Sequence, residues 1–385
     1  MARSTKYCPQ LDAFRGIAIG IVMLHHFFIT HFFLSGFGVT IFFVLSGYFT
    51  TASLMGLRGR VKSGEVAPGA ALRFFLLRKY LRIIPVYYIL LLATVLLGIP
   101  YAREGLVWNA SFLTNFWMIR TGDWPGRFSP LWSLSIVEQF YLTWAVIVLL
   151  RPKWNLLPIA VGAIAAAPLY RAICHIHSLG MGTMYWFALP IADLDSLGCG
   201  VLLALCQLEP ESRFFLDRAV FAGGRICGPI LLAIVALKAV GAELPLNAVY
   251  IPLVASLFFF WLIHRVSRGS EAWGWAFLNW PFLQSIGKMS YSVFLFHNFT
   301  ELLMPNWRPL NSILATDFRV LVLIPVTIFF ASFSWRFVEQ PVLAWRDNLL
   351  RAKVKQPPRA RRAPEPARLA PAYSVDVSGL EGLTP

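Results

Sequence analysis

The sequence predicts an all-α fold, a polytopic integral membrane helical bundle of about ten transmembrane helices. Hydrophobic residues make up 57% of the 385-residue chain and charged residues only 14%, whereas a soluble domain carries about 25% charged residues. Apolar runs of membrane-spanning length follow one another along the chain. Several runs keep ionisable side chains, and a charge in hydrocarbon costs several kcal/mol, so polar chemistry inside the membrane is expected.

The predicted spans are apolar runs, each bounded to within a few residues. In order they cover residues of about 12–33, 36–57, 80–99, 131–150, 155–173, 185–206, 226–241, 247–264, 286–304 and 318–338. Between the third and fourth spans, the shorter apolar piece from Leu106 to Ile119 fits a re-entrant or interfacial helix. Before the ninth span, Trp273, Trp275 and Trp280 predict a segment at the membrane interface.

Basic residues justify the alternation of these spans across the membrane. If ten spans alternate, one side receives Arg3 and Lys6, the loop from Arg58 to Arg82, Arg151 and Lys153, the loop from Arg213 to Arg225, Arg265 and Arg268, and the tail after Trp345. Of the opposite loops, only the 100–130 segment holds several charges and the others are poor in Lys and Arg, so the positive-inside rule places both termini in the cytoplasm. This pattern accounts for the net charge of +15 without a nucleic-acid partner, and the lipid bilayer is the expected partner instead.

Two regions are expected along the chain. Residues 1–345 form the transmembrane domain, and residues 346–385, rich in Pro and Arg, form a disordered basic cytoplasmic tail. The first apolar run is too long for a cleavable signal peptide and is followed at once by a second. The five cysteines include no CxxC pair, so neither a metal site nor a disulfide framework is expected.

The first span carries the most ionisable side chains. His26 follows Arg15 by eleven residues, which places both on one helix face, about 16 Å apart along the axis. Arg15 is then near the cytoplasmic boundary and His26 near mid-membrane, where a neutral imidazole suits a general base. Two structural alternatives stay open, a snorkelling Arg15 and a packed, satisfied His26. His25 points about 100° away from His26 and His31 is closer to the far boundary, so both are weaker candidates.

Basic residues also cluster just before the third span. Arg78, Lys79 and Arg82 precede Pro85, and cations beside a helix end suit a polyanion such as the phosphates of a nucleotide cofactor. Anchoring at the membrane surface is the structural alternative.

Polar residues open the fourth span, on the far side of the membrane, in SPLWSLSIVEQFYLTW. Ser135 and Glu138 lie one helical turn apart and share a face, with Ser133 at the same mouth of the span. A capping-box arrangement is the structural alternative, and it is compatible with contact to a substrate.

Two later segments carry further polar residues. GKMSYSVFLFHNF places His297 well inside the ninth span, and SWRFVEQP places Arg336 and Glu339 at a cytoplasmic helix end. For the second pair a structural ion pair or cap is expected.

Six segments resemble, in this order, the motifs of the acyltransferase family 3 membrane proteins, which are polytopic O-acyltransferases of surface carbohydrates and related acceptors. The segments read LDAFRGIAIGIVMLHHFF, GVTIFFVLSGYF, RKYLRIIP, LWSLSIVEQFYLTW, SYSVFLFH and FVEQP, within residues of about 10–345. The resemblance implies a bacterial inner-membrane enzyme that transfers an acyl group, acetyl being expected, from acyl-CoA to a carbohydrate hydroxyl. It implies acetyl-CoA as co-substrate and no tightly bound cofactor.

The candidate site residues come from the residue pattern and from this resemblance together. They are His26, Arg15 and Glu138 as catalytic residues, Arg78, Lys79 and Arg82 as acyl-CoA-binding residues, and Ser133, Ser135 and His297 as substrate-binding residues. His26 either removes the proton of the acceptor hydroxyl or carries the acyl group as an acyl-imidazole, and the sequence leaves both routes open.

Four positions depart from the family pattern. Lys79 stands where Arg is usual and loses the bidentate geometry toward phosphate. Thr40 replaces an acidic residue, and Val137 replaces the first of two consecutive acidic residues. The basic residue often found before the acidic position of the sixth span is absent near Asp193 and Asp195.

Two other functions remain compatible with the residues. A proton-coupled transporter or flippase would use Arg15, His26 and Glu138 as a proton relay. A degenerate relative that acts as a scaffold or sensor would account for Thr40 and Val137. Acyl transfer is the preferred reading because the six segments occur together and in order.

Overall fold

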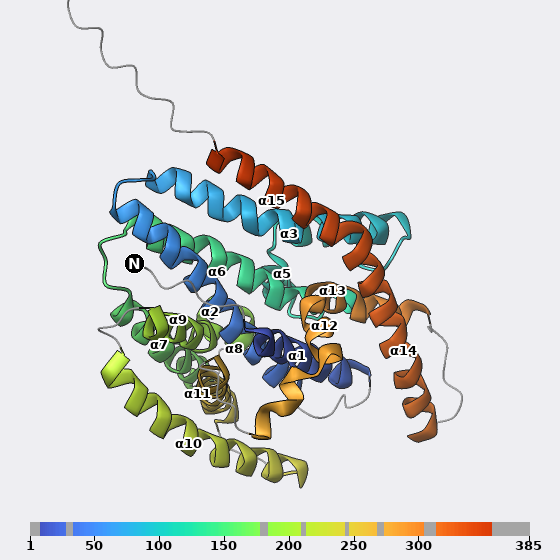
Figure 1. Cartoon of the computed structure of the whole chain (residues 1–385). Helices are drawn as coiled ribbons and strands as arrows, with labels where there is room; N and C mark the ends of the chain where they lie inside the picture. Colours follow the sequence, from blue (N-terminus) through green and yellow to red (C-terminus); the bar gives the residue numbers. More distant parts are fainter. Residues whose placement is uncertain are drawn as a thin grey trace, which may run out of the picture. The chain divides into compact units, whose positions relative to one another are not determined.

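The computed structural model describes residues 8–27, 34–177, 184–208, 213–242, 246–267, 273–303 and 313–355. Every regular element in these ranges is a helix, which confirms the all-α prediction. The chain divides into two compact units, Met1–Leu343 and Ala344–Pro385. The packing described below is that of the first unit (Figure 1).

The helices of more than one turn alternate with short connections. In chain order they are α1 (Pro9–Phe27), α2 (Leu34–Lys62), α3 (Pro68–Leu96), α4 (Leu106–Ala110), α5 (Thr114–Thr121), α6 (Leu131–Leu150), α7 (Leu156–Ile176), α8 (Tyr185–Ala188), α9 (Leu194–Leu208), α10 (Arg213–Ala239), α11 (Asn247–Ser267), α12 (Pro281–Lys288), α13 (Ser290–Thr300), α14 (Ile313–Ser334) and α15 (Gln340–Lys355). The short helical turns are η1 (Gly126–Phe128), η2 (Pro190–Asp193), η4 (Trp273–Asn279), η5 (Glu301–Leu303) and the π-helix η6 (Trp335–Glu339).

Seven helices in the described part of the chain are long and apolar enough to cross a membrane. They are Gly36–Lys62, Pro68–Leu96, Leu131–Leu150, Leu156–Ile176, Pro190–Leu208, Asn247–Ser267 and Leu321–Asn348. Each overlaps a predicted span, so a multi-pass membrane protein is confirmed. The count of ten stays a prediction, because the predicted spans 12–33, 226–241 and 286–304 have no counterpart among the seven.

Two of these three differences have a visible cause. The described part of the first span ends at Phe27, so His31 lies outside the described residues. The ninth span is not one helix, because the helix is interrupted at Met289, between α12 and α13. The apolar piece at 106–119 is likewise divided into α4 and α5, and Phe112 between them has a positive φ of 54°.

The third predicted span differs in where its helix begins. Pro68 occupies the first turn of α3, where its missing N–H costs nothing, so the helix begins well before the predicted start of the span. Pro85 lies inside α3 without ending it. Lys79 and Arg82 therefore belong to a helix, not to the loop that precedes one.

Helix α1 contacts α2, α11, α12, α13 and α14, and it lies near the middle of the helices drawn in Figure 1. Its approach to α12 is close because glycine faces backbone on both sides. A Cβ on Gly16 would meet the carbonyl oxygen of Leu283, and a Cβ on Gly287 would meet that of Asp12. This central, tightly held helix carries Arg15 and His26.

Helices α2 and α9 pack in the same way. A Cβ on Gly47 would overlap the carbonyl oxygen of Leu197, and a Cβ on Gly200 would overlap that of Val44. Small residues let membrane helices approach backbone to backbone. Packing against α9 thereby explains Gly47, the second glycine of the segment GVTIFFVLSGYF.

The predicted boundary between domain and tail falls inside a helix. Residues 346–355 continue α15, whereas residues 356–385 of the predicted tail lie outside the described part. The domain division at residue 345 therefore stays a prediction.

Candidate active site

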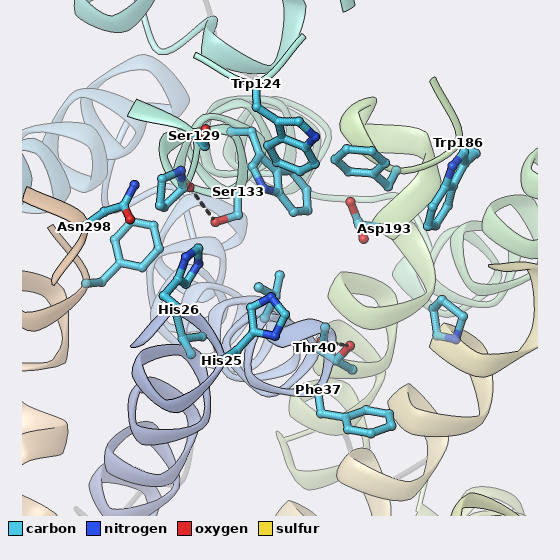
Figure 2. A pocket seen from close by; sticks show the side chains of 18 of the residues that line it. His25, His26, Phe37, Thr40, Trp124, Ser129, Ser133, Trp186, Asp193 and Asn298 are labelled. Atoms are coloured by element: carbon cyan, nitrogen blue, oxygen red, sulfur yellow. Dashed lines mark hydrogen bonds between the residues drawn. The ribbon is translucent and has the colours of Figure 1, made fainter. Parts of the chain in front are cut away.

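A cavity of about 1250 Å³ opens beside the C-terminal half of α1. Among the residues that line it are His25 and His26 of α1, Thr40 of α2, Ser133 of α6 and Asp193 of η2. Figure 2 shows the two histidines on one side of this space and Ser133 and Asp193 on the other. We call it the histidine cavity. Of the nine predicted site residues, only His26 and Ser133 line it.

His26 is backed by His297. The two ring centroids are 5.0 Å apart, and His297 of α13 is fully buried behind His26. The Nδ1 of His297 lies 2.5 Å from the carbonyl oxygen of Phe294, which can only accept, so Nδ1 carries the proton. Its Nε2 is buried without a hydrogen-bond partner in the described part of the chain. This leaves a lone pair beside His26 that can receive an N–H.

His25 also lines the histidine cavity, with its ring centroid 5.4 Å from that of His26. Helical geometry alone predicted that the two side chains diverge. Both side chains nevertheless line the cavity, so the direction in which each one points does not show which histidine is the base. The contact with the His297 ring distinguishes the two histidines, because His26 makes it.

The two serines of α6 differ in position. Ser133 lines the cavity and donates to the carbonyl oxygen of Pro130 at 3.1 Å. Ser135 is fully buried, donates to the carbonyl oxygen of Leu131 at 3.0 Å and does not line the cavity. Neither hydroxyl caps α6, whose N-cap is Pro130 without a side-chain cap. The capping-box alternative is therefore wrong.

A second polar group, the cation cluster, consists of Arg15, Lys79, Arg82 and Glu138. The three cations are near enough to repel one another, and the Glu138 carboxylate is the group that attracts Lys79. The ammonium of Lys79 lies 3.7 Å from the centroid of the Tyr141 ring and donates to Thr50 Oγ1 at 3.3 Å. The sequence singled out these four residues separately, and the structure brings them together.

The remaining contacts of the cluster hold its cations in place. Arg15 lies 3.6 Å from Asp12 and 5.6 Å from the centroid of the Phe49 ring. Glu138 is only 3% exposed, and neither carboxylate oxygen has a hydrogen-bond partner in the described ranges. Arg78, the third residue predicted to bind acyl-CoA, is exposed on α3.

Two helices connect the cation cluster to the histidine cavity. Helix α1 carries Arg15 in the cluster and His26 in the cavity, about 16 Å apart along its axis. Helix α6 carries Glu138 in the cluster and Ser133 in the cavity, about 7.5 Å apart. A small group held between the two sites would therefore have ionic groups on one side and an imidazole on the other.

Sequence reasoning misjudged Glu339. Its carboxylate accepts a short hydrogen bond from Ser292, its other oxygen is buried without a partner in the described ranges, and its charge reaches Arg82. Arg336 is exposed and forms no ion pair with it. Glu339 is the last residue of the π-helix η6 and is buried there. The two residues that meet here belong to two of the family-like segments, Ser292 to SYSVFLFH and Glu339 to FVEQP.

The basic partner that seemed absent near Asp193 and Asp195 comes from the preceding helix. Arg171 of α7 is 2% exposed and its Nη2 lies 2.6 Å from Asp195 Oδ2. The sequence spacing of Arg171 and Asp195 does not predict this ion pair, because the two residues lie on different helices. Within the described residues, no group of three or more His, Cys, Asp or Glu side chains is placed to bind a metal ion.

Comparison with known proteins places this arrangement in a family. Residues 9–336 match the family model of the acyltransferase domain. The peptidoglycan O-acetyltransferase OatA of Listeria monocytogenes is 26% identical over 376 residues, which cover 88% of this chain and 56% of the relative. No solved structure matches the chain.

Two further relatives carry putative assignments in their names. A putative O-acetyltransferase of Staphylococcus aureus is 27% identical over 90% of this chain and 60% of its own length. A putative peptidoglycan O-acetyltransferase of Bacillus subtilis is 30% identical over 36% of this chain and 23% of its own. The chain thus spans 56% of the length of the Listeria relative and 60% of the length of the Staphylococcus relative. Because the family model covers most of the chain, the protein belongs to the acyltransferase 3 family of membrane proteins.

Proposed function

We propose that the protein is a membrane O-acyltransferase, which moves an acyl group, acetyl in the first place, from acyl-CoA to a hydroxyl of a carbohydrate acceptor. The observation that carries the proposal is the link between two sites, in which α1 and α6 each place one residue in the cation cluster and one in the histidine cavity. The relatives support the same chemistry, since their names give O-acetyltransferases.

The cation cluster is the proposed donor side. Arg82 and Lys79, with Arg78 at the surface of the same helix, would bind the phosphates of acyl-CoA through charge-assisted hydrogen bonds. Arg15 would follow along the path of the acyl arm toward the cavity. Glu138 would offset the positive charge of Lys79, as Asp12 offsets that of Arg15 and Glu339 that of Arg82.

The histidine cavity is the proposed acceptor side. The acceptor hydroxyl oxygen attacks the thioester carbonyl carbon while His26 takes the hydroxyl proton. The C–S bond breaks, the new ester keeps the acyl group, and the departing thiolate takes the proton from His26. His297 would accept an N–H of the transient imidazolium through its free Nε2 and so stabilise it.

The location of the two sides follows from the basic loops. The donor would arrive from the cytoplasm, where both termini are expected, and the acceptor from the far side of the inner membrane. A cell-envelope glycan is the acceptor class that fits this arrangement, and the Listeria relative acts by name on one.

Transfer of labelled acetyl groups tests the proposal. Purified protein in lipid vesicles is given labelled acetyl-CoA and an oligosaccharide of β-linked N-acetylhexosamines, and ester product is measured. We expect product only when both substrates are present. Acceptor-independent movement of a solute across the vesicle membrane, without ester product, would support a transporter and contradict the proposal.

Replacement of the cations tests the donor side. The double variant Lys79→Ala/Arg82→Ala should raise the KM for acyl-CoA while the protein still accumulates in the membrane. Lys62→Ala is the matched control, because Lys62 is an exposed cation at the end of α2. An unchanged KM for acyl-CoA in the double variant would leave these residues an anchoring role only.

A further inference from the structure

Aromatic side chains form the wall of the histidine cavity that faces the histidines. This aromatic wall consists of Trp124, Trp132, Trp186 and Phe187, all of which line the cavity. Phe187 is its centre, stacked on Trp124 at 5.5 Å between ring centroids and edge-on to Trp132 and Trp186 at 5.2 Å each. Trp124 is 47% exposed, so its ring is not used up in core packing.

Hydrogen bonds from neighbouring helices hold the segment that carries Trp186 and Phe187 of this wall. Helix α8 and η2 form a short connection whose carbonyl groups accept hydrogen bonds from three side chains on two other helices, α5 and α7. Asn115 donates to Ala188 at 3.0 Å, Tyr170 donates to Tyr185 at 3.1 Å, and Arg171 donates to Ala192. Burying an arginine at membrane depth is costly unless its bonds are satisfied. These bonds hold in place the connection that carries Trp186 and Phe187.

Asp193 stands at the edge of the aromatic wall with an unused acceptor. It lines the cavity, and its Oδ2 is buried without a hydrogen-bond partner in the described part of the chain. The neighbouring Asp195 takes the Arg171 guanidinium, which leaves the Asp193 oxygen to a ligand. Figure 2 shows Asp193 between Trp124 and Trp186, across the cavity from His25 and His26.

We propose that the aromatic wall and Asp193 form the subsite that binds a sugar ring of the acceptor. A pyranose ring has an apolar face of C–H groups and polar hydroxyls at its edge. The face would stack on the aromatic rings and an edge hydroxyl or amide N–H would donate to Asp193. This inference rests on the proposed function, and it names the part of the molecule that selects the acceptor.

The size of the cavity indicates that the ring belongs to a longer glycan. The volume of about 1250 Å³ exceeds the range of about 300–1,000 Å³ that suits a drug-sized ligand. A ring on the wall would leave space toward His26 for the neighbouring sugar that carries the reacting hydroxyl. Binding and chemistry would then occur on adjacent units of one acceptor.

Steady-state kinetics of Trp186→Leu, Phe187→Leu and Asp193→Asn test the subsite, with labelled acetyl-CoA and the N-acetylhexosamine oligosaccharide as substrates. Each variant should raise the acceptor KM about three- to tenfold, the loss of one hydrogen bond or ring contact, while the KM for acetyl-CoA stays within twofold. Trp154→Leu is the matched control, because Trp154 is 52% exposed and outside the cavity. An unchanged acceptor KM in both Trp186→Leu and Asp193→Asn would overturn the subsite.

Direct binding separates this subsite from the proposed function. Retention of the labelled oligosaccharide by purified protein is measured without acetyl-CoA. If wild type binds the probe and Asp193→Asn binds it more weakly, the subsite holds even where no ester is formed. If acetyl transfer occurs while all three variants bind the probe as wild type does, the subsite is wrong and the function stands. Asp193→Asn conserves size, so it tests the subsite even if a ring variant fails to fold.

Discussion

At the residue scale, the least expected feature is Glu138. A buried carboxylate normally has hydrogen-bond partners, because an ionised group is expensive to remove from water. Both oxygens of Glu138 lack such partners among the described residues, and the attraction of Lys79 is its compensation. Lys79 in turn has the Tyr141 ring and Thr50 as its other contacts. The two charges therefore depend on each other.

This dependence predicts non-additive stability. Glu138→Gln and Lys79→Met should each lower the thermal unfolding midpoint in detergent, because each leaves one buried charge unbalanced. The double variant should be less destabilised than the sum, with a coupling of about 0.5–3 kcal/mol. Simple additivity of the two single effects would show that the charges do not interact. Lys62→Met is the control for loss of an exposed cation.

At the element scale, close helix contacts determine where the site residues stand. Helix α2 supplies Thr40 to the histidine cavity and Thr50 to the cation cluster, and Gly47 between them sets its distance from α9. The same helix contains Gly56, where an added Cβ would meet nothing. The two glycines thus offer a matched pair.

Alanine at these two positions should have opposite effects. Gly47→Ala should destabilise the protein by about 1–3 kcal/mol, because the backbone of α9 has no room to yield. Gly56→Ala should be neutral or stabilising by up to about 1 kcal/mol, the difference in helix propensity. Thermal unfolding of the purified variants measures both. Equal midpoints for the two variants would show that the α2–α9 contact is looser than described.

The element scale also shows what the sequence could and could not predict. Hydrophobic length located seven helices that are long and apolar enough to cross a membrane, since burial in lipid demands apolar runs. It could not locate the break at Met289 or the inward turn of Glu339, because a single π-helix or kink leaves composition unchanged. The face of α1 on which His26 lies was predicted from helical geometry, but that geometry did not place His25 at the cavity as well, since the shape of a cavity depends on other helices.

At the scale of the whole molecule, orientation and span number stay predictions. The positive-inside pattern requires α10 to cross the membrane, although α10 is not among the seven helices that satisfy length and composition. Reporter fusions after Gly64, Gln207 and Gly241 test this. We expect the first two in the cytoplasm and the third on the far side. The same side for Gln207 and Gly241 would remove α10 from the membrane and break the alternation.

The order of the motifs in the sequence was enough to recognise the family. The contacts between residues far apart in the sequence could be found only in the structure. Arg15, Lys79, Arg82 and Glu138 were predicted singly and form one cluster. His297 was predicted as a substrate contact, whereas it lies behind His26 and does not line the histidine cavity. Arg171 was missed, because its partners are on another part of the chain.

The proposed function assigns the transfer to His26, backed by His297, in the histidine cavity. The most direct test is ester product formed by membranes that hold equal amounts of wild type, His26→Ala and His25→Ala, with labelled acetyl-CoA and the oligosaccharide acceptor. We expect no transfer above background in His26→Ala and retained, though reduced, transfer in His25→Ala. Turnover of His26→Ala at the wild-type rate, or a loss confined to His25→Ala, would contradict the claim.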